Sequence, residues 1–394
     1  MTGLDHSPFG ARAVALYLTG LAAFTGLYLP QPILPLLADE FGLEAGRAAL
    51  LISVTILGIA LASPLLGVLA DRFGRRNILL IGSLLLGAVS LGAALSPTFT
   101  LLLGFRLAQG LLLPSLLAVG IAYVSDALPV HTMRVVAGLY IAATVTGGMM
   151  GRVVSGTFAD LVGWRYGFLL SAALYLLLVP LWARLRPLRP GSGESSLRGA
   201  LAGTLGHFRN RQIVAGLLIG FFLFFAFQAT FTYLPFRLSR PPFEFTSSLI
   251  GLTYITYSAG VLSSTVAGPL SRVSGLGATL AIGFGLTIAG NALTLAPGLP
   301  LVLAGLLVLC FGNFLVQGLA VGHVATSAES DRAGANALYL LLYYLGGSLG
   351  AYLPGFLFPL FGYAGVIACG IVALLAGSAS VLLLPARNQP PAKP

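Results

Sequence analysis

Apolar residues run through most of the chain in segments of about 20 residues, and short polar loops separate them. A helix needs roughly 20 mostly apolar residues to cross a bilayer. Six such segments precede a polar stretch at 186–210 and six follow it. We therefore predict an all-α membrane protein with twelve transmembrane helices, near 13–37, 47–70, 77–95, 99–125, 134–158, 164–184, 211–238, 246–270, 276–296, 300–326, 333–358 and 363–384.

The two halves of the chain repeat one pattern. Leu139-Tyr140 in the fifth predicted span recurs 199 residues later as Leu338-Tyr339. The glycines that follow keep the same offset: Gly147, Gly148, Gly151 and Gly156 match Gly346, Gly347, Gly350 and Gly355. Tyr28-Leu29-Pro30 also recurs, as Tyr233-Leu234-Pro235. We therefore expect two pseudo-symmetric six-helix bundles, 1–185 and 211–394, joined by a linker at 186–210. Such parallel repeats are typical of one transporter architecture.

Composition excludes a soluble globular protein. The 394 residues are 57% hydrophobic and 8% charged, whereas soluble domains carry roughly 25% charged residues. The net charge of +10 resides mostly in the loops, so topology explains it and we expect no nucleic-acid partner. Cys310 and Cys369 lie within apolar spans without metal-ligand spacing. We predict no metal and no cofactor.

The basic residues orient the chain. If the N-terminus lies inside, the outer loops hold only Arg47, Arg165, Arg237 and Arg240. The inner loops and tails hold fifteen: Arg12, Arg72, Arg75, Arg76, Arg134, Arg184, Arg186, Arg189, Arg198, Arg209, Arg211, Arg272, Arg332, Arg387 and Lys393. Basic residues concentrate on the cytoplasmic side of membrane proteins. We therefore expect a multi-pass protein of the inner membrane with both termini in the cytoplasm.

The loop after the second span carries the most specific motif, Gly67-Val-Leu-Ala-Asp71-Arg72-Phe-Gly74-Arg75-Arg76. It resembles the signature loop of the major facilitator superfamily, and the resemblance extends to the twelve spans and the basic linker. The chain is most similar to the proton-coupled drug and metabolite exporters of that superfamily.

The resemblance implies a gating role for the 67–76 loop. Gly67 and Gly74 would permit close helix approach and a tight turn. Asp71 would face the start of the span near Ala333, as an anion at a helix N-terminus. Arg75 would bridge Asp71 and Asp126, and this cluster, with Arg72 and Arg76 beside it, would hold the inner gate closed. The alternative is that Arg72, Arg75 and Arg76 only mark the cytoplasmic side of the membrane.

Two arginines lie within predicted spans, where a charge is costly. Arg106, in Arg106-Leu-Ala-Gln109-Gly110, matches a superfamily motif that is tied to proton coupling. Arg152 follows the glycines of the antiporter motif, although arginine replaces the expected proline. Arginine offers a fork of donors that suits carboxylate or phosphate. Arg152 or Arg106 therefore either contacts an anionic or strongly hydrogen-bonding substrate, or is a structural residue satisfied by Gln109, Gln31 or backbone carbonyls.

The remaining polar residues cluster in the spans that would surround a cavity. We expect the substrate to contact Arg152, Arg106, Gln31, Gln109, Gln228, Tyr233, Tyr257, Asn313, Gln317, Tyr339 and Tyr343. His323 is the one histidine within a predicted span and could carry a proton, with packing as the alternative role. No Asp or Glu lies in the middle of a predicted span, so the proton-binding group stays open between Arg106, His323 and the outer carboxylates Asp39 and Glu40.

We therefore predict a secondary active transporter that moves a small solute by alternating access, coupled to protons and exporting. An organic-anion or sugar carrier, by uniport or exchange, is the alternative. The sequence lacks the His-Glu-x-x-His and Gly-x-Ser-x-Gly motifs, so we expect no enzyme. The expected partners are the substrate, protons and the bilayer, and we expect a monomer.

Overall fold

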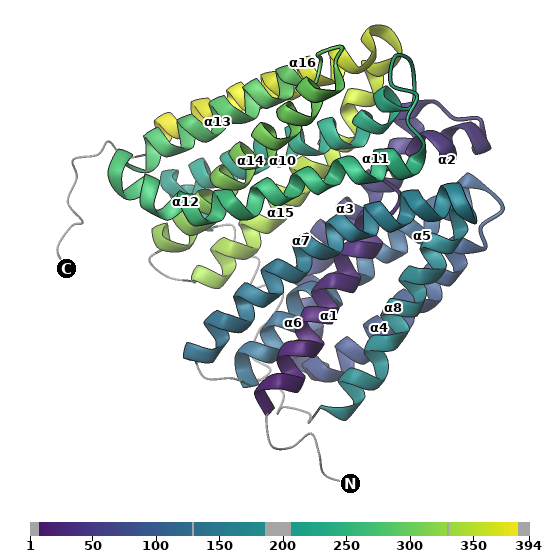
Figure 1. Cartoon of the computed structure of the whole chain (residues 1–394). Helices are drawn as coiled ribbons and strands as arrows, with labels where there is room; N and C mark the ends of the chain where they lie inside the picture. Colours follow the sequence, from purple (N-terminus) through teal and green to yellow (C-terminus); the bar gives the residue numbers. More distant parts are fainter. Residues whose placement is uncertain (1–7, 128–129, 186–205, 329–330, 385–394) are drawn as a thin grey trace. The chain divides into compact units, whose positions relative to one another are not determined.

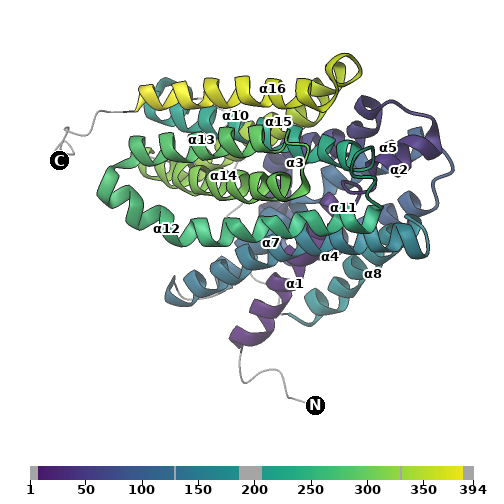
Figure 2. The same ribbon diagram turned by 45° about the horizontal axis from the view of Figure 1, so that its top comes forward.

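The computed structural model describes residues 8–127, 130–185, 206–328 and 331–384, which are almost wholly helical and contain no strand (Figures 1 and 2). The first half holds α1 (Pro8–Tyr28), α2 (Leu34–Phe41), α3 (Ala45–Phe73), α4 (Arg75–Ala94), α5 (Phe99–Leu112), α6 (Pro114–Ala127), α7 (Val130–Leu161) and α8 (Arg165–Arg184). The second half holds η1 (His207–Arg209), α10 (Arg211–Leu238), α11 (Ser247–Thr253), η2 (Tyr254–Ser258), α12 (Ala259–Ser274), α13 (Leu276–Leu293), α14 (Leu299–Ser327), α15 (Arg332–Tyr352), η3 (Leu353–Phe356), α16 (Phe358–Ala379) and η4 (Ser380–Leu383).

Ten described helices are long and apolar enough to cross a membrane. They account for every predicted span except 134–158 and 333–358, which correspond to α7 and α15. The fold is therefore an all-helical membrane fold. Most of the predicted linker, at residues 186–205, lies outside the described residues.

The prediction of one continuous first span at 13–37 is wrong. Helix α1 ends at Tyr28, and a separate helix, α2, begins at Leu34. Pro30 and Pro32 lie between them. Proline lacks the N–H that a helix needs and clashes with the preceding turn, so the apolar run is broken although its hydropathy is continuous. The predicted span at 333–358 ends early for a similar reason, since α15 passes into the short 3₁₀ helix η3 at Leu353-Pro354.

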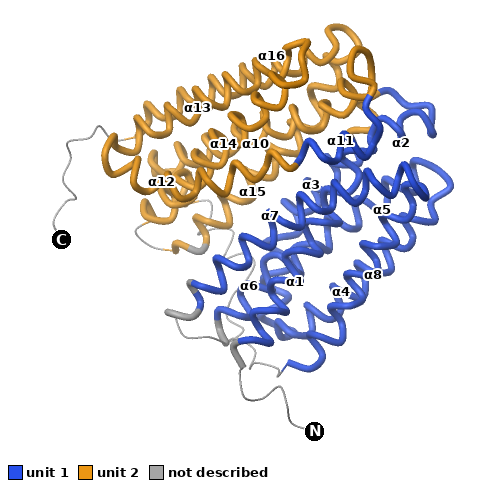
Figure 3. The backbone as a smooth tube through the Cα atoms, viewed as in Figure 1, with its two compact units in different colours: residues 1–44, 50–197, 245–254 blue, residues 45–49, 198–244, 255–394 orange. Residues whose placement is uncertain are grey.

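The described residues form two compact units, shown in blue and orange in Figure 3. Unit 1 comprises 1–44, 50–197 and 245–254, and unit 2 comprises 45–49, 198–244 and 255–394. Each unit therefore includes a short segment from the other half of the chain. Helix α11 belongs to unit 1, and the first residues of α3 belong to unit 2.

Within each unit the glycine-rich helix packs closely on the first helix of the same half. In unit 1, a Cβ added to Gly147 would lie 2.3 Å from the Leu21 carbonyl oxygen of α1. In unit 2, a Cβ added to Gly346 would lie 2.2 Å from the Phe221 carbonyl oxygen of α10. Only glycine permits this backbone approach, so the repeated glycines fix the same helix pair, α1–α7 and α10–α15, in both units.

Candidate functional site

The break at the end of α1 leaves backbone carbonyls without helical partners. In a continuous helix the Gly26 carbonyl would accept from the N–H of the residue four positions later, but that residue is Pro30, which has no N–H. The Gln31 N–H bonds to Tyr28, so Leu27 also loses its usual partner. Buried carbonyls need a donor, and the unit must supply donors from other helices.

Arg106 of α5 supplies two of these donors. Its Nη1 donates to Gly26 over 2.9 Å and its Nη2 donates to Leu27 over 2.6 Å, while Nε donates to Leu51 of α3 over 3.1 Å. The side chain is fully buried. The cation also lies at the negative C-terminal end of α1, where positive charge is favourable. Ser155 of α7 completes the cap by donating to the Leu29 carbonyl over 2.6 Å.

The other residues of the Arg106 motif connect α5 to neighbouring helices. Gln109 Oε1 accepts from Arg106 over 2.6 Å, and Gln109 Nε2 donates to Ser90 of α4 over 2.8 Å. A Cβ added to Gly110 would lie 2.2 Å from the Thr55 carbonyl oxygen of α3. Arg106 and Gln109 therefore tie α1, α3, α4 and α5 together, with their hydrogen-bonding groups directed at protein partners.

Arg152 of α7 lies in a different environment. Its guanidinium carbon is 4.0 Å from the ring centroid of Tyr28 and 4.7 Å from that of Tyr254. Its Nε donates to Gln31 Oε1 over 2.7 Å, and its Nη1 donates to the Gly148 carbonyl over 2.6 Å. The side chain is fully buried, so Arg152 is a desolvated cation beside two aromatic rings, an arrangement worth about 2 kcal/mol per ring.

Gln31 gives this cluster an unused donor. Its Oε1 accepts from Arg152, which fixes the amide, but its buried Nε2 has no hydrogen-bond partner among the described residues. A buried polar group without a partner costs about 1–3 kcal/mol. We call Tyr28, Gln31, Arg152 and Tyr254 the Arg152 cluster. It combines a cation, a free N–H donor and aromatic faces, which suits a ligand with a carboxylate or another oxygen acceptor.

Helix α11 brings Tyr254 to this cluster by packing along α7. The Asp160 carboxylate, near the end of α7, accepts from the N–H groups of Ser247 over 3.2 Å and Ser248 over 2.8 Å. A Cβ added to Gly156 would lie 2.2 Å from the Ser247 carbonyl oxygen, and one added to Gly251 would lie 2.7 Å from the Arg152 carbonyl oxygen. The α7–α11 interface thus runs from Asp160 to Arg152.

The hydrogen bonds at Asp160 alter its ionisation. Partial burial raises the pKa of this carboxyl, but hydrogen bonds from Ser248, Thr246 and Ser247 outweigh that effect and hold the pKa below its ordinary value. Asp160 is therefore an anion at neutral pH, at the positive end of α11.

The predicted 67–76 loop, which contains the predicted gating residues, is helical except for Gly74: residues 67–73 end α3, and Arg75 and Arg76 begin α4. Gly74 has φ of +87°, a conformation that favours glycine, and it forms the turn between the helices. Arg75 Nη2 lies 3.5 Å from Asp71 Oδ1, and its Nη1 donates to the Ala122 carbonyl of α6 over 2.7 Å. Arg72 lies over the Phe73 ring at 5.6 Å.

Two expectations for this loop differ from the structure. A Cβ added to Gly67 would meet nothing within 4 Å among the described residues, so no helix approaches it closely here. Arg76 does not join a charge cluster but donates to the backbone carbonyls of Trp182 and Ala183 in α8, because it points across unit 1 from the start of α4. The side chain of Asp126 lies outside the described residues.

The predicted site residues of the second half lie in unit 2, around an aromatic cluster. Phe227 and Phe231 of α10 contact Tyr257 of η2 at centroid distances of 5.3 and 4.7 Å. Tyr343 of α15 stacks on Phe224 at 4.0 Å with an interplanar angle of 6°. Tyr343 and Tyr257 therefore lie against apolar rings.

Other residues of this set retain unpartnered polar atoms. Tyr233 donates to the Ala351 carbonyl over 3.0 Å and is satisfied. Neither amide atom of the buried Gln228 has a hydrogen-bond partner among the described residues. The same holds for Asn313 Oδ1, Gln317 Oε1 and the Tyr339 hydroxyl. Unit 2 thus offers neutral hydrogen-bonding groups and rings where unit 1 offers a cation.

His323 lies near the end of α14, away from the aromatic cluster. Its Nε2 is 3.2 Å from the Gln212 carbonyl oxygen and 3.3 Å from Ser327 Oγ. Gln212 belongs to the first turn of α10. His323 therefore ties α14 to the start of α10, and its side chain is only partly buried.

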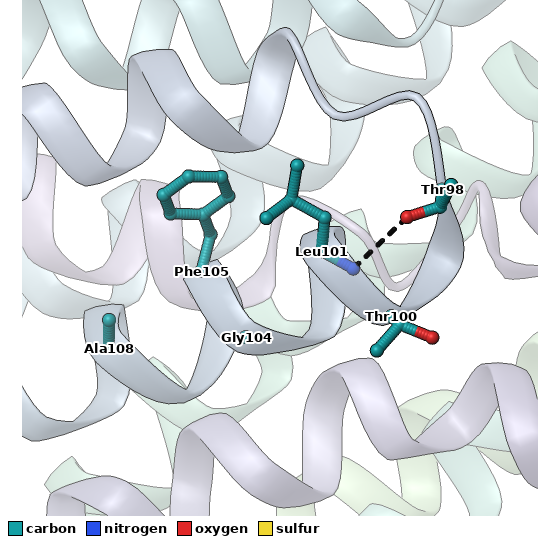
Figure 4. A pocket seen from close by; sticks show the side chains of 6 residues that line it. All are labelled: Thr98, Thr100, Leu101, Gly104, Phe105 and Ala108. Atoms are coloured by element: carbon teal, nitrogen blue, oxygen red, sulfur yellow. Dashed lines mark hydrogen bonds between the residues drawn. The ribbon is translucent and has the colours of Figure 1, made fainter.

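One apolar pocket of about 580 Å³ lies on α5, lined by Thr98, Thr100, Leu101, Gly104, Phe105 and Ala108 (Figure 4). The hydroxyl of Thr98 is used to cap the helix, by accepting from the Leu101 N–H. The pocket includes none of the predicted site residues, and its lining carries no charge.

Sequence reasoning did not select Tyr28, Tyr254, Ser155 or Asp160 as site residues. Tyr28 was visible only as part of a repeated motif. Tyr254, from the second half of the chain, contacts Arg152 of α7, and Asp160 of α7 contacts Ser248 of α11. No local sequence pattern predicts these two contacts.

The chain matches the Major Facilitator Superfamily over residues 16–241. It is 31% identical to the inner membrane transport protein YnfM of Escherichia coli over 378 residues, which cover 93% of this chain and 89% of that protein. It is 28% identical over 374 residues to an uncharacterised transporter of Buchnera aphidicola, with 93% and 89% covered.

Solved transporters share the fold. A bacterial homologue of the human lysosomal transporter Spinster superposes with a TM-score of 0.76 at 16% identity, over 96% of this chain and 95% of that one. The family and the relatives are transporters and not enzymes, and the E. coli relative is a protein of the inner membrane. The chain therefore belongs to the Major Facilitator Superfamily and is a multi-pass membrane transporter of small molecules.

Proposed function

We propose that this transporter is a secondary carrier that moves a small organic anion across the inner membrane by alternating access. The observation that carries the proposal is the Arg152 cluster: a fully buried cation between two tyrosine rings, beside the unpartnered Nε2 of Gln31. A charge in the membrane is costly, and a ligand that accepts from Arg152 and Gln31 would offset part of that cost.

Arg106 supports the assignment by contrast. Its donors contact the carbonyls of Gly26, Leu27 and Leu51 and the amide of Gln109, which supports a structural role in capping α1. Of the two predicted arginines, Arg152 is therefore the better candidate for substrate binding.

The remaining features of the proposal come from the sequence pattern. We propose twelve spans, with α7 and α15 completing the ten apolar helices, and both termini in the cytoplasm. Asp71 and Arg75 would hold the inner gate. The resemblance to drug and metabolite exporters favours export that is coupled to proton entry and carried out by a monomer. His323 is a candidate proton carrier.

The test uses purified protein in proteoliposomes. Ligands are screened by thermal shift, and each hit is tested for uptake with and without an imposed pH gradient, in wild type and Arg152→Gln. We expect organic anions to shift wild type and not the variant, and a pH gradient to change their uptake.

The same screen separates the second candidate function, multidrug export. The neutral rings and amides of unit 2 favour lipophilic ligands. If only neutral or cationic lipophiles bind, with equal affinity in Arg152→Gln, the anion proposal is wrong and multidrug export takes its place.

A further inference from the structure

We infer that Tyr254 links occupancy of the Arg152 cluster to the attachment of α11 on α7, so that an anion bound at Arg152 displaces Tyr254 and loosens α11. The inference rests on the proposed function only in naming an organic anion as the displacing ligand. Three features of the α7–α11 interface support it.

The first feature is access. Arg152 is fully buried, and the rings of Tyr28 and Tyr254 lie on its guanidinium. A ligand of more than a few atoms cannot reach the cation unless one ring moves, because the protein interior is close-packed. An anion on the guanidinium would also weaken the attraction between the cation and the rings, since its negative charge would offset the positive charge that the ring faces attract.

The second feature is the difference between the two rings. Tyr28 ends α1, where Arg106 and Ser155 hold the neighbouring carbonyls of Gly26, Leu27 and Leu29. Tyr254 instead begins η2, a 3₁₀ segment between α11 and α12. Hydrogen bonds of 3₁₀ helices have poorer geometry, and such a segment within a longer helix often marks a hinge. Tyr254 is therefore the ring that moves more readily.

The third feature is the position of that hinge in the chain. The passage from unit 1 to unit 2 falls between Tyr254 and Ile255, inside η2 (Figure 3). Residues 245–254 are held in unit 1 by Asp160 at one end and by Tyr254 on Arg152 at the other. Loss of the Tyr254 contact would release the C-terminal end of this segment and so weaken its remaining attachment at Asp160, Gly156 and Gly251.

Amide hydrogen exchange reads this attachment directly, because the N–H groups of Ser247 and Ser248 donate to Asp160. The measurement is deuterium uptake of peptides covering 245–254 in the full-length protein, with peptides from α13 as an internal reference. Without any ligand, we expect Tyr254→Leu and Arg152→Gln each to raise exchange there roughly tenfold. The double variant should show no more than either single change, because both remove the same contact.

Two matched controls separate this effect from general loosening. Tyr254→Phe keeps a ring on the guanidinium, and Leu252→Ala changes an exposed side chain of α11 that is 46% accessible. In both variants, the exchange rate of residues 245–254 should stay within about twofold of the wild-type rate. Exchange at the wild-type rate in Tyr254→Leu, or additive effects in the double variant, would overturn the inference.

The ligand arm uses benzoate and its neutral analogue benzamide. We expect benzoate to raise exchange at 245–254 in wild type and not in Arg152→Gln, and benzamide to change neither. Binding of benzoate by thermal shift without increased exchange would overturn the inference and leave the anion site intact. Absence of benzoate binding would contradict the proposed anion, while the ligand-free variants still decide the role of Tyr254, so the two failures are distinguishable.

Discussion

Helix pairs α1–α7 of unit 1 and α10–α15 of unit 2 share a glycine scaffold but differ at its centre. Gly151 approaches Thr25 of α1, and Gly350 approaches Phe225 of α10, each so closely that a Cβ would contact backbone. The residue after the glycine is Arg152 in unit 1 and Ala351 in unit 2. The repeat thus preserves the packing of the helices, while a single side chain, Arg152, gives the centre of the α1–α7 pair a buried charge that the α10–α15 pair lacks there.

The tyrosines of the repeated Tyr-Leu-Pro motif also have different partners in the two units. Tyr28 lies beside the Arg152 guanidinium, whereas Tyr233 donates to the Ala351 carbonyl. The two helices also end at different points relative to the motif, because α1 ends at Tyr28 while α10 continues through Pro235 to Leu238. A second proline, Pro32, follows the motif only in the first half. The broken helix requires a cap, and unit 1 has Arg106 where α14 of unit 2 contains no arginine.

Removing the Arg106 cap should have the largest effect on stability. Arg106→Leu leaves the Gly26 and Leu27 carbonyls buried without donors, at about 1–3 kcal/mol each. We expect the protein to lose about 3 kcal/mol of stability or to fail to accumulate in the membrane. Thermal unfolding in detergent measures the change. An unfolding temperature equal to that of wild type would show that the cap is dispensable.

Alanine substitutions at the matched glycines test whether the α1–α7 and α10–α15 pairs depend equally on close helix packing. Gly151→Ala and Gly350→Ala place a Cβ 2.7 Å from Thr25 Cα and 2.1 Å from the Phe225 carbonyl oxygen, respectively. We expect each to destabilise by about 1–3 kcal/mol, through strain in the packed backbone. Gly285→Ala in α13 is the control, since a Cβ there meets nothing within 4 Å and alanine favours a helix. If only one of the two glycine variants were destabilised, the scaffolds would not be equivalent.

Substitution of Arg152 tests whether the buried charge of the α1–α7 pair binds the ligand. Arg152→Gln should weaken binding of an organic anion by roughly tenfold or more, because a charged hydrogen bond is worth about 1.5–3 kcal/mol. Arg152→Lys keeps the charge but loses the planar group that stacks between Tyr28 and Tyr254, so we expect intermediate binding. Isothermal titration of the purified protein distinguishes the three cases. Equal affinities would assign Arg152 a structural role like that of Arg106.

The smallest effect should come from Asp160. Asp160→Ala removes the acceptor for Ser247 and Ser248, and we expect a loss of about 1 kcal/mol, typical of a helix cap. The folded carboxyl has a lowered pKa, so its contribution is present at neutral pH and is lost as pH falls through that pKa. The difference in unfolding temperature between wild type and Asp160→Ala should therefore stay constant from pH 8 to pH 5. A difference that disappeared within this range would contradict the assigned ionisation.

The sequence by itself determined the helical membrane fold, most span positions and the repeat. Continuous hydropathy and glycines at a fixed offset are local or periodic signals, and the helix interior satisfies its own backbone wherever they occur. The same signals placed both buried arginines within spans. Pro30 and Pro32 are signals that could have predicted the end of α1, but the continuous apolar run around them indicated a single span.

Only the tertiary structure decided which groups the two arginines contact. Arg106 and Arg152 have the same chemistry, yet one meets the free carbonyls of α1 and the other meets two rings and an amide. Which partners each guanidinium reaches depends on how helices distant in sequence approach one another. The contacts of Tyr254 with Arg152 and of Ser248 with Asp160 join positions 102 and 88 residues apart in the sequence. No periodicity within either segment encodes them, since they arise from the close packing that Gly156 and Gly251 permit.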